Sequence, residues 1–378
     1  MILNRRLAAN PPSVIRRIGE TAASIPGCLR LTIGEPDFDA PLSVRQRIAE
    51  AIAGGDTHYP PNAGIMPLRR ETAAYLNGRF GSDYLPEETL ITVGSTEALG
   101  SALFAILNPG DEVICLTPCF GLYKPLIEMA GGVYRPLPRG EGITKEKLAQ
   151  AVTSRSKAVL FASPNNPDGW AADEEDLAAL RACALENELF LLADSVYDSL
   201  VYGGPVPSLM GDAALRDRLI YVGALSKTYA MTGVRLGYAA ADAPVMREMI
   251  KAHSFLVVSA PGCIQSGCLG IFDIPFEEMR ATYEKRRDRV AGRLEKMGLP
   301  VRLPRGAFYI YPSIGETGLD ADTFCDRLMR EGGLALIPAS AFDDRGHVRI
   351  SYCYAEDVLE EGMNRLERFI GILRKERR

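Results

Sequence analysis

Short apolar runs alternate with stretches of helical periodicity through the middle of the chain. The runs have the length of strands and occupy residues 90–93, 112–116, 158–162, 189–193, 219–222 and 236–240. Residues 43–53 and a stretch that begins at residue 66 have the apolar spacing of helices, as do the segments between the later runs. This alternation is typical of βα units and predicts an α/β fold with a mostly parallel sheet between helices.

The pattern changes near both ends. Residues 1–30 are punctuated by prolines and suit an arm, and residues 31–38 predict a short strand that breaks into a turn. Beyond residue 274 a long charged helix at 276–297 leads to strands at 307–311 and 347–351 and to helices at 321–331 and 356–373. We therefore expect three parts: an N-terminal arm with part of a small domain at 1–40, a large domain at 41–274, and a smaller α+β domain at 275–378.

Chemically useful side chains follow the apolar runs. Phe120 follows the run at 112–116, Asn166 the run at 158–162, Asp194 and Tyr197 the run at 189–193, and Lys227 the run at 219–222. In open α/β sheets ligands bind beyond the carboxyl ends of the strands. Each residue alone has a structural explanation, such as a turn or a helix cap. Because such a residue follows each of these runs, we expect all of them to line one crevice.

Lys227 is the candidate for covalent chemistry. A lysine amine becomes a good nucleophile when it is partly desolvated or lies beside other cations. Lys227 follows a predicted buried strand and precedes Arg235 by eight positions. This setting favours a Schiff base with a carbonyl cofactor, although a lone Ser-Lys pair is also typical of a solvated surface lysine.

A second candidate is an anion site at residues 94–99, where Gly94, Ser95 and Thr96 open a predicted helix directly after a strand. Free backbone N–H groups and the positive end of the helix dipole favour phosphate at such a position. Ser and Thr also cap helices that bind nothing, so the motif alone does not decide.

Composition narrows the class of protein. The 378 residues are 47% hydrophobic and 24% charged with a net charge of −5, which is typical of a soluble globular protein and argues against binding to nucleic acid or to an anionic membrane. Eight cysteines and three histidines show no zinc-ligand spacing, so we expect no metal site. The absence of a signal-peptide or membrane-spanning pattern predicts a cytoplasmic location.

Together these motifs resemble those of the class I/II pyridoxal-phosphate-dependent aminotransferases, the aspartate aminotransferase superfamily, from about residue 34 to residue 365. The resemblance implies the aminotransferase-like fold of pyridoxal-phosphate-dependent transferases, with a large and a small domain. It implies that Lys227 holds pyridoxal 5'-phosphate as an internal aldimine and then moves the proton between Cα and the cofactor. Asp194 resembles the carboxylate that keeps the pyridine nitrogen protonated.

Other residues are similar to further cofactor contacts of the family. Asn166 and Tyr197 resemble the pair that hydrogen-bonds the phenolic oxygen of the cofactor. Phe120 occupies the position of the aromatic residue that stacks on the pyridine ring, where family members often have Tyr or Trp. The resemblance thus implies that all three surround the ring.

The phosphate would be held by Ser95, Thr96 and Arg235, whose guanidinium suits phosphate oxygens. Many family members have a serine three residues before the lysine, but this chain has Ala224, which leaves one hydroxyl fewer around the phosphate. Ser226 is the candidate that takes its place.

Tyr59 resembles the tyrosine that family members lend to the phosphate of the neighbouring subunit, which implies a homodimer. Arg349 resembles the arginine that grips the substrate's α-carboxylate, with Asn166 and the backbone of Gly34 as further substrate contacts; a surface ion pair is the alternative. The implied reaction moves the amino group of an L-α-amino acid to a 2-oxo acid through a pyridoxamine intermediate.

The same residues also serve carbon-sulfur β-lyases, which are the alternative function. A ligand-sensing regulator with this fold would need a DNA-binding domain for which the residues before Gly34 provide no helix-turn-helix pattern. For the substrate side chain we note Arg30 as a candidate cation, and the stretch 254–260 as a candidate wall that would favour neutral or aromatic side chains.

Overall fold

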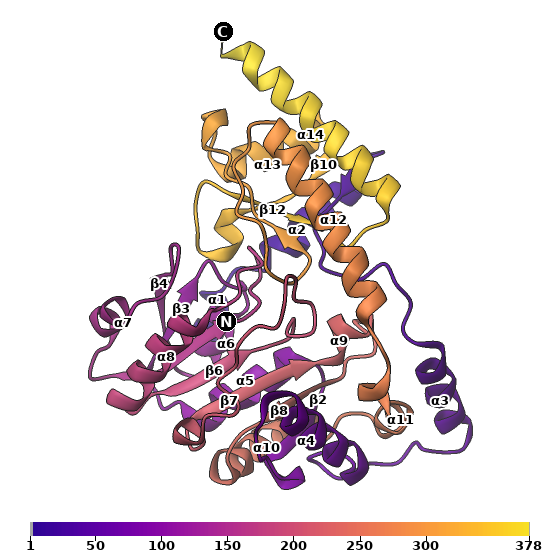
Figure 1. Ribbon diagram of the computed structural model, residues 1–378, viewed down its shortest axis with the longest axis vertical. Helices are drawn as coiled ribbons and strands as arrows, with labels where there is room; N and C mark the ends of the chain where they lie inside the picture. The colour runs from indigo at the N-terminus through magenta and orange to yellow at the C-terminus, as the bar shows by residue number, and fades with distance from the viewer. Residues whose placement is uncertain (1–2, 378) are drawn as a thin grey trace.

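The computed structural model describes residues 3–377. These residues form two bodies stacked along the long axis of the molecule (Figure 1). The lower one, here called the large body, is built on a seven-stranded sheet. The upper one, the small body, combines α2, the short strand β1 and most of the chain after residue 276. The predicted domain limits at residues 40 and 274 stay a prediction.

The sheet of the large body has the strand order β2-β8-β7-β6-β5-β3-β4. All neighbouring pairs are parallel except those of β8, which runs antiparallel to both β2 and β7. The prediction of an α/β fold with a mostly parallel sheet is therefore confirmed. The strands are β2 (Thr89–Thr92), β3 (Glu112–Thr117), β4 (Val133–Pro138), β5 (Ser156–Ala162), β6 (Phe190–Asp194), β7 (Leu219–Ala224) and β8 (Gly237–Ala240).

Helices cover both faces of this sheet. Successive strand residues point to opposite faces, so Leu191 joins one apolar core and Leu192 the other. One face carries α4 (Met66–Phe80), α7 (Lys145–Ala151) and α8 (Glu174–Glu186); the other carries α5 (Ser95–Ile106), α6 (Tyr123–Met129) and α10 (Ala243–Val257). Because the central strands are buried on both faces, they appear in the sequence as unbroken apolar runs.

The small body packs helices against two small sheets. The antiparallel sheet β11-β12-β9 and the parallel pair β1-β10 share one apolar core with the helices around them. Its elements are α2 (Val14–Ala23), β1 (Leu29–Arg30), α12 (Glu277–Lys296), β9 (Tyr309–Ile310), α13 (Ala321–Glu331), β10 (Leu334–Ala335), β11 (Ile337–Pro338), β12 (Val348–Ser351) and α14 (Glu356–Glu376).

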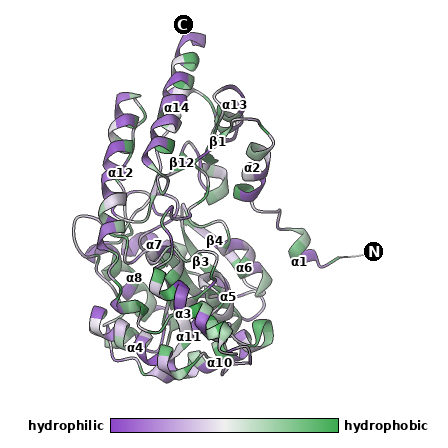
Figure 2. Cartoon of the chain, turned by 90° about the vertical axis from the view of Figure 1, so that its right-hand side faces the viewer, coloured by the Kyte–Doolittle hydropathy of each residue, from purple (hydrophilic) through white to green (hydrophobic). Residues whose placement is uncertain are grey.

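The remaining elements are short or lie at the periphery. Helix α1 projects from the rest of the molecule, beside α6 (Figure 2). These elements are α1 (Arg5–Ala8), α3 (Leu42–Ala53), α9 (Leu225–Thr228), α11 (Gly262–Gly267) and five 3₁₀ turns at Pro86–Glu88, Ala213–Leu215, Ile271–Asp273, Gly315–Thr317 and Ala339–Phe342. No helix within residues 3–377 is both long and apolar enough to cross a membrane.

The predicted strand at 31–38 is wrong in position. The strand in this region is β1, two residues long at Leu29–Arg30. The backbone of Leu31 still donates to Ala335 and accepts from Ser351, but residues 31–38 are not part of a strand.

Candidate active site

The carboxyl ends of the parallel strands face the small body, and a cavity of about 460 Å³ lies between them. Its wall contains eleven of the twelve predicted site residues; only Tyr59 is missing. The eleven are Gly34, Ser95, Thr96, Phe120, Asn166, Asp194, Tyr197, Ser226, Lys227, Arg235 and Arg349. The topology of the sheet therefore brings together residues that are up to 315 positions apart in the sequence.

Lys227 lies where β7 passes directly into the single turn α9. Its Nζ donates a hydrogen bond to the backbone oxygen of Gly34 at 2.8 Å. Burial lowers the pKa of the amine to about 8, the positive charges of Arg235 and Arg349 act in the same direction, and the neighbouring Glu35 opposes them. The amine is thus much more often neutral near neutral pH than that of a solvated lysine, as a nucleophile or a proton acceptor requires.

Asp194 ends β6 and is buried. One carboxylate oxygen accepts a 2.6 Å hydrogen bond from the hydroxyl of Tyr123, and the other accepts from the backbone N–H of Val196. Burial raises the pKa of Asp194, opposed by these two hydrogen bonds and by the charge of Lys227. A buried carboxylate held in this way is stabilised by a cationic N–H donor that enters the cavity.

Arg349 lies on β12 with its guanidinium fully enclosed. It donates to Asn166 Oδ1 at 2.8 Å and to the backbone oxygen of Thr32, and its Cζ lies 4.4 Å from the ring centre of Tyr309. Its Nε has no hydrogen-bond partner within residues 3–377. No carboxylate neutralises the charge of Arg349 in an ion pair among these residues, so the buried guanidinium is suited to an anion that arrives from outside.

Tyr197, Tyr309 and Gly34 line the cavity together. Their hydroxyls lie 2.8 Å apart, and their rings meet edge to face. A Cβ atom on Gly34 would fall 1.7 Å from the hydroxyl oxygen of Tyr309. Only glycine therefore allows this backbone to approach so closely, which also places its carbonyl oxygen against Lys227.

The predicted anion site is formed by the start of α5 and by Arg235. Gly94 precedes the helix with a φ of +78°, and a Cβ there would lie 2.6 Å from Nη2 of Arg235. Arg235 itself has a φ of +60°, a conformation that costs a non-glycine residue about 1–3 kcal/mol and is found mainly at functional sites. Ser95 and Thr96, in the first turn of α5, and this guanidinium thus lie in the same cavity wall.

A comparison of the sequence with models of protein families identifies the family to which the chain belongs. The family model described as aminotransferase class I and II matches residues 26–366. The chain belongs to this family. It is an aminotransferase, and two relatives extend over nearly its whole length: aromatic-amino-acid aminotransferase 2 of Thermococcus litoralis and aspartate aminotransferase of Pyrococcus abyssi, each 36% identical over 98% of both chains.

Solved aminotransferase structures share the fold. The aspartate aminotransferase of Thermotoga maritima superposes with a TM-score of 0.94 at 32% identity, covering 98% of this chain and all of the other. That of Thermus thermophilus with maleate gives a TM-score of 0.93 at 34% identity, covering 97% and 99%. The fold expected from the resemblance is thus confirmed.

Two aromatic residues of the aminotransferase cavity were missed by sequence reasoning. Tyr123 is the first residue of α6, whereas Phe120 lies in the loop before this helix, and their rings meet edge to face with centroids 5.8 Å apart. The junction of loop and helix has no periodicity that would mark Tyr123 as a cavity residue. Tyr309 lies in a run of five apolar or aromatic residues, so alternation does not show which of them faces the cavity.

Tyr59 lies outside the cavity of its own chain, with 85% of its surface exposed. Its loop is tied to the end of α10 by a 2.7 Å hydrogen bond from Asn62 to Ser254. Phe255, next to Ser254, is also 85% exposed. The stretch 254–260 and Arg30, considered for the substrate side chain, do not line the cavity of the single chain either.

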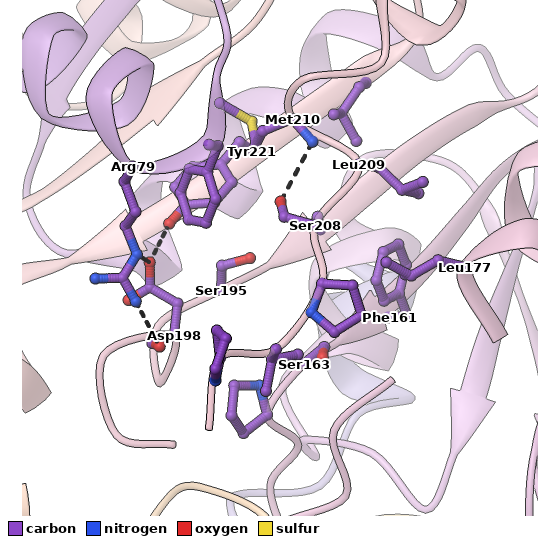
Figure 3. Close-up of a pocket in the computed structure, with 17 residues that line it drawn as sticks. Arg79, Phe161, Ser163, Leu177, Ser195, Asp198, Ser208, Leu209, Met210 and Tyr221 are labelled. Atoms are coloured by element: carbon purple, nitrogen blue, oxygen red, sulfur yellow. Dashed lines mark hydrogen bonds and ion pairs between the residues drawn. The ribbon is translucent and has the colours of Figure 1, made fainter. Parts of the chain in front are cut away.

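A separate cavity of about 210 Å³ lies between α4, the sheet and residues 205–210 (Figure 3). Its polar groups satisfy one another: the hydroxyl of Tyr221 donates to Asp198 at 2.6 Å, and Arg79 donates to the backbone oxygen of Asp198 at 2.8 Å. None of the twelve predicted site residues lines it. The larger cavity around Lys227 is therefore the candidate active site.

Proposed function

We propose that this aminotransferase uses pyridoxal 5'-phosphate held by Lys227 to transfer the amino group of an L-α-amino acid to a 2-oxo acid in two half-reactions. The observation that carries the proposal is the convergence of an amine with a pKa near 8, a buried carboxylate and an enclosed guanidinium on one cavity. The bound cofactor would supply an electron-withdrawing ring that stabilises negative charge at the substrate's Cα.

The donor set fits that cofactor. The N-terminus of α5 with Ser95 and Thr96, together with Arg235, is suited to the phosphate, and buried Ser226 adds a hydroxyl where Ala224 lacks one. Asp194, oriented by Tyr123, would accept from the N–H of the ring and keep it protonated. Phe120 provides a stacking surface, and Asn166 and Tyr197 provide donors for the phenolic oxygen.

Arg349 would bind the α-carboxylate of the amino acid, because its enclosed guanidinium has a free Nε and no ion-pair partner within residues 3–377. The substrate's Cα would then face Nζ of Lys227. The neutral form of that amine, favoured by its lowered pKa, would accept the Cα proton of the amino acid in the first half-reaction. In the second half-reaction it would deliver a proton to Cα of the incoming oxo acid. Lys227 is thus both the attachment point and the base.

The visible spectrum of the purified protein loaded with pyridoxal phosphate tests this function. Without any oxo acid, suitable amino acids should convert the yellow form to the colourless amino form of the cofactor, and an oxo acid should restore it. The panel includes aspartate and an aromatic amino acid, since relatives are named for both classes. A yellow form that persists while ammonia and pyruvate accumulate would show a β-lyase instead.

We also propose that the chain acts as a homodimer in the cytoplasm, with Tyr59 reaching the phosphate of the partner's site. Tyr59, Phe255, Leu256 and Val258 form an exposed apolar surface, joined through the Asn62–Ser254 hydrogen bond. An exposed surface of this kind is typical of an interface. Loss of the hydroxyl in Tyr59→Phe should weaken cofactor binding about 10- to 100-fold, the effect of one hydrogen bond to a charged group.

Hybrid dimers distinguish a shared site from a site within one chain. In a dimer of one Tyr59→Phe chain and one Lys227→Ala chain, sharing across the interface places both defects in one site and leaves the other intact. Half of the sites should then bind cofactor with wild-type affinity. If Tyr59 served its own chain, no site would be intact: one site would have the weakened affinity of Tyr59→Phe, and the other would lack the lysine.

A further inference from the structure

A buried imidazole next to the proposed phosphate site has no task in the proposed function. His253 lies on α10, which packs against α5, and its side chain is fully buried. Its Nδ1 lies 3.0 Å from Oε2 of Glu97, the third residue of α5. Neither ring nitrogen has a well-directed hydrogen bond within residues 3–377, so the contact with Glu97 is mainly electrostatic.

The carboxylate of Glu97 is held on both oxygens by groups away from the first turn of its own helix. Oε2 accepts from the backbone N–H of Val93 at 3.1 Å, and Oε1 accepts from the hydroxyl of Ser101 at 2.6 Å. A glutamate at the third helical position commonly folds back to the N–H of the N-cap residue. Here the N-cap is Gly94, and Glu97 bonds one residue earlier. The N–H groups that open the helix therefore stay clear of this carboxylate.

The charge of Glu97 matters because of its position. Glu97 directly follows Ser95 and Thr96, which line the cavity where we place the phosphate. Carboxylates and phosphates are both attracted to the N-terminus of a helix, so the two compete there. No arginine or lysine within residues 3–377 lies within ion-pair distance of Glu97. His253 is thus the basic side chain that faces this carboxylate.

We propose that His253 is a positioning residue for the cofactor phosphate: it holds the carboxylate of Glu97 towards α10 and so keeps the first turn of α5 available to the phosphate. This rests on the proposed function and adds to it a residue outside the cavity wall. In a neutral or a protonated ring, Nδ1 can carry the hydrogen that faces the carboxylate. Without it, Glu97 would repel the phosphate or occupy the helix start in its place.

A comparison of pyridoxal phosphate with pyridoxal, which lacks the phosphate, isolates this effect. The ratio of their association constants, read from the yellow absorbance band, should fall about 3- to 30-fold in His253→Leu, the effect of one charge at a partly buried helix terminus. His253→Met is the second apolar variant, for the case that leucine does not fit the space. His253→Asn should recover part of the loss, because its amide can place an N–H near the position of Nδ1.

A double variant separates a charge effect from a packing defect. Adding Glu97→Gln to His253→Leu removes the uncompensated charge but keeps an oxygen that can accept from Val93, so the ratio should return towards that of the wild type. A ratio that stays low in the double variant would show a packing defect and overturn the role of His253.

Glu112→Gln is the matched control. Glu112 is a buried carboxylate at the start of β3, and it accepts from Thr153 and Arg155 at 2.7 Å each. Its replacement should lower the melting temperature because charged hydrogen bonds are lost, but it should leave the ratio unchanged. A fall in the ratio with Glu112→Gln as large as that with His253→Leu would mean that general destabilisation, not the position of Glu97, sets the ratio.

Inorganic phosphate gives a readout that needs neither cofactor nor turnover. The rise in melting temperature of the cofactor-free protein in phosphate, relative to chloride of equal ionic strength, should be smaller in His253→Leu and restored in the double variant. An unchanged ratio and an unchanged rise in His253→Leu would overturn the proposal. If the wild type forms no yellow band with either aldehyde, the proposed function fails, and the melting experiment still decides the role of His253. A wild type that binds both aldehydes equally would refute the phosphate site and this role with it.

Discussion

Replacement of Lys227 with alanine is expected to abolish the yellow absorbance band of the cofactor-loaded protein and to reduce turnover by at least about 10²–10⁴-fold, the range attributed to one positioned proton-transfer group. The structure gives the reason: Nζ of Lys227 is the amine in the cavity wall, and burial lowers its pKa to about 8. The measurement is the absorbance spectrum with added pyridoxal phosphate, followed by single-turnover rates with an amino acid.

Two controls keep the result interpretable. The thermal melting temperature of Lys227→Ala should not fall, because the substitution removes a partly buried charged group that contributes only one hydrogen bond, to Gly34. Attachment of the cofactor to the wild type should accelerate as the pH rises towards 8 and level off above it, since the amine is neutral above its pKa. A yellow band that survives in Lys227→Ala would show that another amine holds the cofactor.

The strand-end residues of the site were predictable because the sheet topology is simple. Asn166, Asp194 and Lys227 each follow an apolar run, and parallel strands bring their carboxyl ends to one edge. The direction of β8 was not apparent from its apolar composition. The connection between the two strands, from Ala224 at the end of β7 to Gly237, has twelve intervening residues, which is just enough for a parallel crossover, so its length gives no signal of the direction either.

Other features had no such local signal. Strand β4 was not predicted, since it is an edge strand with mostly exposed side chains and two prolines, at positions 136 and 138. Arg16 also lines the cavity, and it does so only through the packing of α2 on the small body, about 210 residues away from Lys227 in the chain. Long-range packing of this kind leaves no trace in the periodicity of either segment.

Substitution of Asp194 by asparagine is expected to leave the cofactor bound but to lower kcat by about 10²–10³-fold, the range seen when one preorganised electrostatic group is removed. Asparagine keeps an oxygen that accepts from Tyr123 but lacks the negative charge that would hold a proton on the ring nitrogen. The measurement is kcat for both half-reactions under saturating pyridoxal phosphate. Tyr123→Phe is the matched variant: it keeps the carboxylate and removes one hydrogen bond, so its loss should be smaller.

Thermal melting separates this charge effect from a packing defect. Without cofactor, Asp194 is a buried carboxylate whose raised pKa reflects the cost of its charge, so Asp194→Asn should melt at the same or a higher temperature than the wild type. The rise in melting temperature on adding pyridoxal phosphate should be smaller in the variant, because the favourable pairing of the carboxylate with the protonated ring is lost. Wild-type kcat together with an undiminished rise would mean that a group other than Asp194 keeps the ring protonated.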